Sequence, residues 1–538
     1  MYIGKKTIRT AAVSLFALTV AAFSAVPAGI GASAATTGTP YNVTAGVGTN
    51  ESEVRFTWMS QGSTAGVLEI AKTGDVKNGS FPAGSDKKAS TAKVSATEGV
   101  LDAPNNSDHS ISDLKDANGN ALQDEYSSKV TVGGLSANTS YTYRVGDGTT
   151  WSKTYTFQTE DPKNGFSFAA FGDPQIGASG NPDKDKIGWA NTLSKVYARD
   201  PKLNFLFTMG DQVNDYDHLS SQQKEYDNFF NPDFTKDYLQ DHLLAAFSGN
   251  HDFQMGKYYS FHYNQPNLST LGQTTTNGVA DSNGDYWFRY GNSLFMQLEG
   301  NNFYDTAAHD SFLQQAISAN PTAKWKVVSF HQAPYSEANH DGATTSDDDV
   351  MFMRKNWTKL MDKYGVDIVL NGHDHYYTRS YQMYGGSPVS TAKTDKVTNP
   401  KGTVYFTLDS GSGSKYYKYN TTADHSFSAF GWQNNTPTYT YAKVTDKAFT
   451  LTTYATNSDK PIDTYTITKT TGASGTGTVK KSTMGVAKAV APSAQNTAAV
   501  SDPLTDGASG TWFFLAAVAA ALIITVICIA AQKKKANG

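Results

Sequence analysis

Short alternating stretches fill the first third of the chain. Residues 54–58 alternate apolar and polar side chains as a half-buried strand does, and stretches at 129–132, 139–146 and 151–159 follow, separated by Gly, Asn or Asp. About seven short strands within roughly 120 residues are typical of a β-sandwich. We therefore predict a sandwich domain over residues 40–160.

The pattern changes after residue 165. Apolar runs with few interruptions alternate with helical patterns at 186–198 and 311–319. The runs are 166–171, 203–209, 243–247, 325–330 and 366–370, and further strands are expected at 404–408, 449–454 and 463–468. Strands that are apolar on both faces and alternate with helices indicate a layered α/β domain, which we place at residues 165–470.

The two ends of the chain predict export and anchoring. Residues 1–34 combine a basic start, an apolar segment and the small residues Ala32-Ser33-Ala34, as a cleaved signal peptide does; an uncleaved N-terminal anchor is the alternative. Residues 512–531 carry no charge and are long enough to cross about 30 Å of hydrocarbon. The lysines of the tail, 532–538, favour a cytoplasmic C-terminus, with the rest of the chain outside.

The segment before this expected transmembrane helix predicts a flexible linker. Residues 471–510 are rich in Ala, Ser, Thr and Gly and have no apolar period. Pro503 and Thr505 match a sortase sorting signal, whereas Asp502 and Asp506 depart from it. A simple membrane anchor is the first expectation, and sortase attachment to a cell wall is the second.

Composition narrows the partners. The formal net charge is −4 and no long Lys/Arg run occurs in the body of the chain, so we expect no nucleic-acid partner. The single cysteine, Cys528, lies in the C-terminal apolar segment. The exported part is therefore expected to have no disulfide, and core packing and bound metal are its expected sources of stability.

Five polar motifs follow directly on the apolar runs. They are Gly172-Asp173-Pro174-Gln175, Gly210-Asp211-Gln212-Val213-Asn214, Gly249-Asn250-His251-Asp252, Phe330-His331 and Asn371-Gly372-His373-Asp374-His375. Each motif alone also suits a turn, a helix cap or a satisfied polar residue. Because the carboxyl ends of strands line the crevice of an open α/β sheet, all five are expected at one edge. Carboxylate, amide and imidazole groups of this kind hold Zn, Mn or Fe.

The ordered set resembles the calcineurin-like metallophosphoesterase superfamily. The segment Leu135-Ser136-Ala137-Asn138-Thr139-Ser140-Tyr141-Thr142-Tyr143-Arg144-Val145-Gly146 is similar to the fibronectin-like domain that precedes the catalytic domain of purple acid phosphatases. The resemblance covers residues 41–469. It implies an α+β/β multi-domain fold: an N-terminal β-sandwich, then a four-layer α/β/β/α metallophosphoesterase domain, with the C-terminal transmembrane helix beyond it.

The resemblance also implies a metal centre with two divalent or trivalent ions of Fe, Zn or Mn. Asp211 would bridge the two ions. One ion would also take Asp173 and His375, and the other would take Asn250, His331 and His373.

Two positions depart from the relatives. Purple acid phosphatases carry Tyr where Asn214 stands, and that tyrosinate colours their iron, so we expect a colourless enzyme. Many calcineurin-like enzymes carry His where Gln175 stands. We expect the Gln175 carbonyl oxygen to act as a substitute ligand, with hydrogen bonding to bound water as the alternative.

The expected reaction is hydrolysis of a phosphate ester by a metal-bridging hydroxide that attacks phosphorus in line. His251 follows a ligand and by family position faces the substrate, and His340 lies nine residues after His331; both are candidate catalytic residues. Arg379 echoes the end of the family's last motif, where a structural salt bridge is favoured over phosphate binding.

Three functions compete. A cell-surface phosphomonoesterase, acid phosphatase-like and acting on a small-molecule phosphate ester, is the first prediction. A phosphodiesterase or nucleotidase shares the same metal core, and a non-catalytic surface adhesin with a metal-binding domain is the alternative from another class. Substrate choice is expected in loops at 179–186, 218–235 and 336–349.

Overall fold

The computed structural model describes residues 38–470, apart from 63–64, 95–123, 254–256, 277–278, 281–283 and 341–347. The expected signal peptide, linker, transmembrane helix and cytoplasmic tail lie outside these residues. In the part of the chain that is described, no helix has the length and apolar character needed to span a bilayer.

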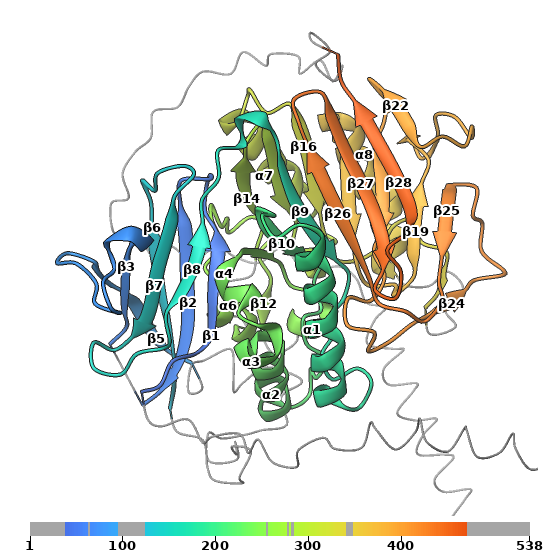
Figure 1. The fold of residues 1–538 in the computed structure, drawn as a ribbon. Helices are drawn as coiled ribbons and strands as arrows, with labels where there is room; N and C mark the ends of the chain where they lie inside the picture. The colour runs from blue at the N-terminus through green and yellow to red at the C-terminus, as the bar shows by residue number, and fades with distance from the viewer. Residues whose placement is uncertain are drawn as a thin grey trace, which may run out of the picture. The chain divides into compact units, whose positions relative to one another are not determined.

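Three large sheets form the scaffold (Figure 1). The order of the eleven-stranded sheet is β22 (Lys396–Thr398), β28 (Pro461–Thr468), β27 (Ala448–Ala455), β26 (Thr438–Val444), β9 (Phe166–Phe171), β10 (Phe205–Thr208), β11 (Leu243–Ala246), β1 (Tyr41–Val47), β2 (Val54–Gln61), β6 (Glu125–Val132) and β5 (Ser90–Lys93). The order of the seven-stranded sheet is β14 (Tyr286–Tyr290), β15 (Ser293–Gln297), β16 (Trp325–Ser329), β18 (Ile368–Asn371), β23 (Val404–Thr407), β19 (Tyr377–Ser380) and β25 (Ser428–Trp432). The four-stranded sheet is β4 (Asp86–Lys88), β3 (Val67–Lys72), β7 (Ser140–Gly146) and β8 (Tyr155–Gln158).

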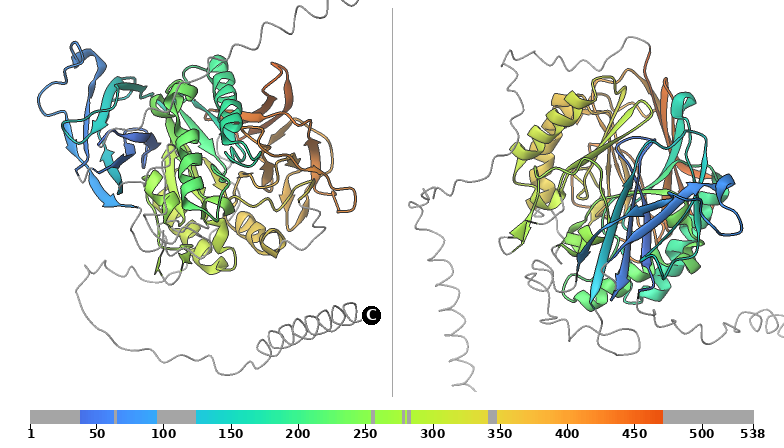
Figure 2. Two further views of the ribbon diagram at one scale, coloured as in Figure 1. Left: turned by 90° about the horizontal axis from the view of Figure 1, so that it is seen from below. Right: turned by 90° about the vertical axis from the view of Figure 1, so that its left-hand side faces the viewer.

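Helices flank the two larger sheets (Figure 2). They are α1 (Pro182–Arg199), α2 (Leu219–Phe230), α3 (Pro232–Thr235), α4 (Tyr238–Asp241), α5 (Asn250–Phe253), α6 (Tyr258–His262), α7 (Thr306–Ala319) and α8 (Asp348–Tyr364). Because successive side chains of a strand point to opposite faces, each central strand serves two cores. In β9, Phe168 and Ala170 face the second sheet, whereas Ala169 and Phe171 pack with Trp189 of α1. The catalytic part therefore has four layers, helix, sheet, sheet and helix.

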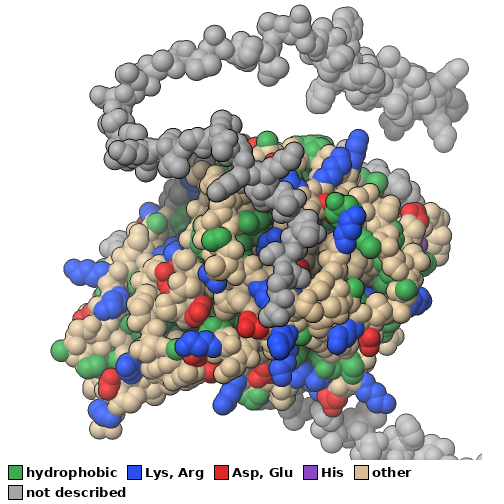
Figure 3. All heavy atoms as spheres, turned by 90° about the horizontal axis from the view of Figure 1, so that it is seen from above, with side chains coloured by type: hydrophobic (Ala, Val, Ile, Leu, Met, Phe, Trp, Pro, Cys, Tyr) green, Lys and Arg blue, Asp and Glu red, His purple; other side chains and the backbone are tan. Residues whose placement is uncertain are grey.

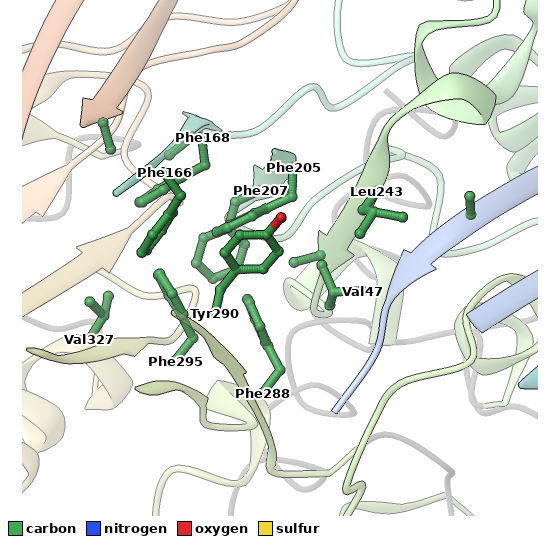
Figure 4. Close-up of a cluster of buried hydrophobic side chains, with 14 of the residues drawn as sticks. Val47, Phe166, Phe168, Phe205, Phe207, Leu243, Phe288, Tyr290, Phe295 and Val327 are labelled. Carbon is green, nitrogen blue, oxygen red and sulfur yellow. The ribbon is translucent and has the colours of Figure 1, made fainter. Parts of the chain in front are cut away.

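The layer between the two sheets is built from aromatic rings (Figure 4). Phe168 stacks on Phe205 with ring centroids 4.8 Å apart, and Phe288 stacks on Phe295 at the same distance. Phe205 meets Phe295 edge to face at 5.4 Å, which joins the two pairs across the layer. Such offset and edge-to-face pairs add about 0.5–1.5 kcal/mol each beyond area burial. This rigid core supports the strand ends that carry the polar motifs.

The N-terminal sandwich is joined to the catalytic part by backbone pairing. β1 pairs in parallel with β11, with Gly46 opposite Leu244, so one sheet of the sandwich continues the catalytic sheet. The expectation that β2 is half-buried is wrong, because Thr57 is almost fully buried. Helix α6 covers this face: the Ser127 hydroxyl and the Lys129 ammonium on β6 donate to main-chain carbonyls of the helix, 2.6 Å away in each case.

Capping explains why two helices begin earlier than their apolar periods. The Asn181 side chain accepts a hydrogen bond from Lys184 N, and Pro182 occupies the first turn of α1. The Asp305 side chain likewise accepts from Ala308 N at the start of α7. The expected strand at 151–159 is shorter in the structure, since Trp151 forms only an isolated bridge with Gly146.

Candidate metal centre

The polar motifs follow strands that lie next to one another. Asp173, Asp211 and Asn250 come after β9, β10 and β11, which are parallel neighbours in the first sheet. His331 and His373 come after β16 and β18, parallel neighbours in the second sheet. Because carboxyl ends of parallel strands meet at one edge, residues far apart in sequence converge there.

Glycines let the motif backbones approach the site. A Cβ on Gly249 would lie 2.0 Å from Asp211 Oδ1, and a Cβ on Gly372 would lie 2.6 Å from Asp173 Oδ1. No other residue fits at such distances without moving the carboxylate. Gly249 and Gly372 are therefore packing requirements of the site.

Four site residues hold left-handed backbone conformations. The φ angles are 34° at Gln175, 45° at Asp211, 74° at His373 and 42° at His375. A non-glycine residue in this region costs of order 1 kcal/mol or more, and such residues cluster at functional sites. The fold therefore holds these four side chains in place against a local backbone preference.

The donor atoms lie at the separations expected of ligands that share an ion. Two atoms each about 2.1 Å from one metal, in tetrahedral or octahedral geometry, lie about 3.0–3.4 Å apart. Asn250 Oδ1 lies 3.1 Å from both His331 Nε2 and His373 Nδ1. His331 Nε2 lies 3.3 Å from Asp211 Oδ2, and His375 Nε2 lies 3.5 Å from Asp173 Oδ2. The structure thus brings all six expected ligands together, while their individual roles stay predictions.

Backbone carbonyls orient two of the imidazoles. His331 Nδ1 donates to Met209 O at 2.8 Å, and His375 Nδ1 donates to Lys415 O at 3.0 Å. A proton held on Nδ1 leaves Nε2 with its lone pair free for a cation, the usual arrangement of a metal-binding histidine. Nε2 of His331 faces Asp211, and Nε2 of His375 faces Asp173.

The charges inside the centre also fit a cation. Asp173 is fully buried, and neither of its carboxylate oxygens has a hydrogen-bond partner among the described residues. Burial raises the pKa of Asp173 and, with the Lys415 charge, lowers the pKa of His375 to about 3. At His331 burial is outweighed by the carboxylates of Asp211 and Asp173, which raise its pKa to about 10. Two metal ions would satisfy these carboxylates and replace the proton.

A pocket of about 340 Å³ opens onto the centre. Among its lining residues are both candidate catalytic histidines and Gln175, whose buried Oε1 meets no hydrogen-bond donor in the described part of the chain. His251 N donates to Asp211 Oδ1 at 3.0 Å, and His340 Nδ1 donates to Asp374 Oδ1 at 3.0 Å. The free carbonyl of Gln175 suits the proposed ligand role and equally suits a hydrogen bond to bound water.

Two family models match the chain, one at the N-terminal sandwich and one at the catalytic part. The N-terminal domain of purple acid phosphatases matches residues 40–159, and the calcineurin-like phosphoesterase model matches residues 166–377. This chain is a calcineurin-like metallophosphoesterase. Members of this superfamily hold two metal ions, and the donor set described above suits a dinuclear centre of the purple acid phosphatase type.

Individual relatives of the metallophosphoesterase are distant. An uncharacterized protein of Mycobacterium tuberculosis is 25% identical over 52% of this chain and 57% of its own length, less than two thirds of that relative. A nucleotide pyrophosphatase/phosphodiesterase of Hordeum vulgare is 23% identical over 50% of this chain and 76% of its own length. The structure of a purple acid phosphatase from yellow lupin has a TM-score of 0.60 at 17% identity, covering 80% of this chain and 75% of that one. The last likeness shows the fold.

Helix α2 of the metallophosphoesterase holds a catalytic candidate in place, which the sequence did not reveal. Glu225 Oε2 accepts hydrogen bonds from Asn214 N at 2.8 Å and Asp215 N at 2.7 Å. Gln222 Nε2 donates to Asp215 O and to His251 O. Asn214 O in turn accepts a hydrogen bond from His251 Nδ1, so Nε2 of His251 is left for the pocket. The main-chain carbonyl of Asn214 therefore orients His251.

Three further pocket residues were missed. Tyr216 packs against His251 with centroids 5.2 Å apart, and Lys415 and Tyr417 lie after β23. The prediction that residues 218–235 form a substrate loop is wrong, because helices α2 and α3 occupy most of this range. The sequence did predict the strand at 404–408, and the other site residues follow the ends of predicted strands. The segment after residue 408, which contains Lys415, could have been considered for the same reason.

A short ribbon places His340 beside this loop. β17 (Ala338–Asn339) pairs antiparallel with β24 (Lys418–Tyr419). His340 therefore stacks on His373, with centroids 4.5 Å apart, and receives the Tyr417 hydroxyl at its Nε2, 3.3 Å away.

Arg379 is structural, as favoured from the sequence. Its guanidinium binds both oxygens of Asp463, at 2.6 and 3.1 Å, within the body of the fold.

Proposed function

We propose that this metallophosphoesterase is a phosphomonoesterase that hydrolyses small-molecule phosphate esters. The observation that carries the proposal is the convergence of six candidate metal ligands, four of which line a pocket together with His251 and His340. When bound, two metal ions polarise phosphate oxygens and make water acidic enough to attack phosphorus near neutral pH. A pocket of about 340 Å³ accommodates a phosphoryl group with a small leaving group.

The chain's own residues divide the remaining tasks. His251 is held by its backbone on Asp211 and by its Nδ1 on Asn214 O, so its Nε2 is left for the substrate. With both ring nitrogens protonated, Nε2 would donate to the departing oxygen. His340 is hydrogen-bonded to Asp374 and Tyr417, which follow strands of the seven-stranded sheet. No hydroxyl or thiol of the described pocket residues is required as a nucleophile.

A phosphodiesterase is the second candidate. Its support is the Hordeum vulgare relative, whose name states nucleotide pyrophosphatase/phosphodiesterase activity and of which this chain covers 76%.

The test is a substrate screen of the ectodomain, residues 35–470, with Mn, Zn and Fe supplied separately. p-Nitrophenyl phosphate and bis(p-nitrophenyl) phosphate share one leaving group, so their kcat/KM ratio reports mono- against diester preference. A ratio well above one supports the proposal, and a ratio below one favours the diesterase. Two metals per chain without hydrolysis of any ester would point to the surface-adhesin alternative.

We also propose that the catalytic part acts outside the cell. The support is the signal-like segment at 1–34 and the uncharged segment at 512–531 with its lysine tail. Whole cells should then hydrolyse a membrane-impermeant ester, and protease treatment of whole cells should remove that activity. Activity confined to the lysate would contradict this location.

A further inference from the structure

Main-chain hydrogen bonds hold the segment around Lys415 in place, and they do not involve the Lys415 side chain. Its carbonyl accepts from His375 Nδ1 at 3.0 Å, and Tyr417 N donates back to His375 O. The segment 415–417 is therefore bound to a candidate metal ligand through main-chain atoms. A change of the Lys415 side chain leaves both hydrogen bonds in place.

Lys415 and Tyr417 both line the pocket, and the Lys415 ammonium lies over the Tyr417 ring. Its Nζ is 4.7 Å from the centroid of Tyr417, whose ring also contacts His340 and His375. Among the described residues that line the pocket, Lys415 is the one lysine or arginine, and no described carboxylate forms an ion pair with it. Lys415 is half-buried, and an ammonium that no described carboxylate pairs with is the group that an additional substrate charge would satisfy.

The charge of the site distinguishes two classes of ester. Asp173 and Asp211 offset roughly half of the charge of two divalent ions. A phosphomonoester carries a charge of about −1.5 to −2 at neutral pH, whereas a diester carries about −1. The extra charge of the monoester resides on a third non-bridging oxygen, which a diester replaces by a second ester group. An ammonium at the wall attracts that oxygen and gains little from a diester.

We infer that Lys415 is a specificity-determining residue that binds the additional anionic oxygen of a phosphomonoester and thereby selects monoesters over diesters. The inference rests on the proposed phosphomonoesterase function and names the group that would set its preference. Lys415 forms a charge-assisted hydrogen bond to substrate, with no covalent role.

The chain offers a matched control. Lys418 lies three residues further on, is exposed, and pairs through its backbone in β24. Lys415→Met removes the charge and keeps the length of the side chain, Lys415→Arg keeps the charge, and Lys418→Met removes a nearby charge outside the pocket.

The kinetic test compares p-nitrophenyl phosphate with bis(p-nitrophenyl) phosphate in the metal-loaded ectodomain. For Lys415→Met, kcat/KM on the monoester should fall about 10- to 100-fold, the range of a charge-assisted hydrogen bond, and kcat/KM on the diester should change less than about threefold. Lys415→Arg should recover part of the monoester activity, and Lys418→Met should match the unmodified protein on both esters. Equal losses on both esters for Lys415→Met would overturn the inference.

A binding measurement separates this inference from the proposed function. By calorimetry, Lys415→Met should weaken the affinity for inorganic phosphate about tenfold or more and leave that for dimethyl phosphate unchanged. Metal analysis should still find two ions per chain, because the carbonyl that orients His375 remains. Unchanged phosphate affinity, or loss of metal, would overturn the role of Lys415. If the unmodified protein hydrolyses neither ester, the proposed function fails, and the phosphate titration still decides the role of Lys415.

Discussion

Two buried carboxylates in this molecule differ in what surrounds them. Glu125, at the junction of sandwich and catalytic part, receives Tyr41 Oη at 2.6 Å and Gln223 Nε2 at 3.1 Å on one oxygen. Tyr258 Oη lies 3.3 Å from its other oxygen. Asp173 is as deeply buried, yet its oxygens face imidazole nitrogens and have no hydrogen-bond partner among the described residues.

The difference shows how a structural polar cluster can be told from a binding site. Burial raises the pKa of both carboxyl groups. Around Glu125 neutral donors complete the hydrogen bonds, so nothing further is needed for stability. Around Asp173 the lone pairs remain open and point to other ligand atoms, which is an unfavourable arrangement unless a cation binds. The described residues on the face seen in Figure 3 give no comparable signal, because basic, acidic and hydrophobic side chains are interspersed there.

The largest effect is expected from Asp211→Ala. Its carboxylate faces His331 Nε2, and its loss removes the proposed bridge between the two ions. Activity should fall by more than about 1,000-fold, beyond the 10- to 100-fold typical of residues that merely support ligands. Metal analysis should find fewer than two ions per chain. Full activity would contradict the assignment of the centre.

His251→Ala should separate metal binding from turnover. Its side chain touches Asn214 O and the pocket, so both ions should stay while kcat falls about 10²- to 10⁴-fold, the usual contribution of a general acid. Metal content and steady-state rates on the same samples provide the check. Loss of metal in this variant would instead place His251 among the ligands.

A matched pair, Glu225→Ala and Glu125→Ala, tests the comparison directly. Glu225→Ala releases the backbone of Asn214 and Asp215 and should lower kcat about 10- to 100-fold with both metals retained. Glu125→Ala should lower the free energy of unfolding by about 1–3 kcal/mol and leave kcat of the folded protein unchanged. Denaturant titrations and kinetics distinguish them; a catalytic loss in Glu125→Ala would erase the distinction.

The junction should also limit stability in acid. Burial lowers the pKa of His262 to about 3, compared with 6.5 for an unperturbed histidine, and its ring stacks on Tyr226 at 3.9 Å. As pH falls, His262 takes up a proton in the unfolded chain before it does so in the folded protein. The contribution of neutral, buried His262 to the free energy of unfolding is therefore complete above pH 6.5. It is lost by about 1.4 kcal/mol per pH unit as pH falls toward 3.

The difference in unfolding free energy between the unmodified protein and His262→Gln should therefore shrink as pH falls. A pH-independent difference for His262→Gln would show that the acid sensitivity lies elsewhere.

The smallest expected signal is optical. Asn214 carries no phenol, so iron-loaded protein should show no visible phenolate-to-iron band. Absorption spectra of the iron-reconstituted ectodomain test this. A band would identify Tyr216 or Tyr417, the phenols that line the pocket, as a ligand.

Much of the site was predictable because it depends on local rules. Apolar runs such as 166–171 and 243–247 became buried strands, and polar residues at their carboxyl ends had to meet at one edge. The glycines before Asp211, Asn250 and His373 were readable in the same motifs, and the structure shows the close approaches that require them.

The sequence by itself determined the strand-end motifs, the chemistry of their side chains and the order in which they occur, because strand periodicity and residue type are local properties. Only the tertiary structure decided that β1 extends the catalytic sheet, that Glu225 and Gln222 orient His251, and that Lys415 faces the pocket. Those outcomes depend on contacts between residues tens to hundreds of positions apart, which no periodicity in the chain encodes.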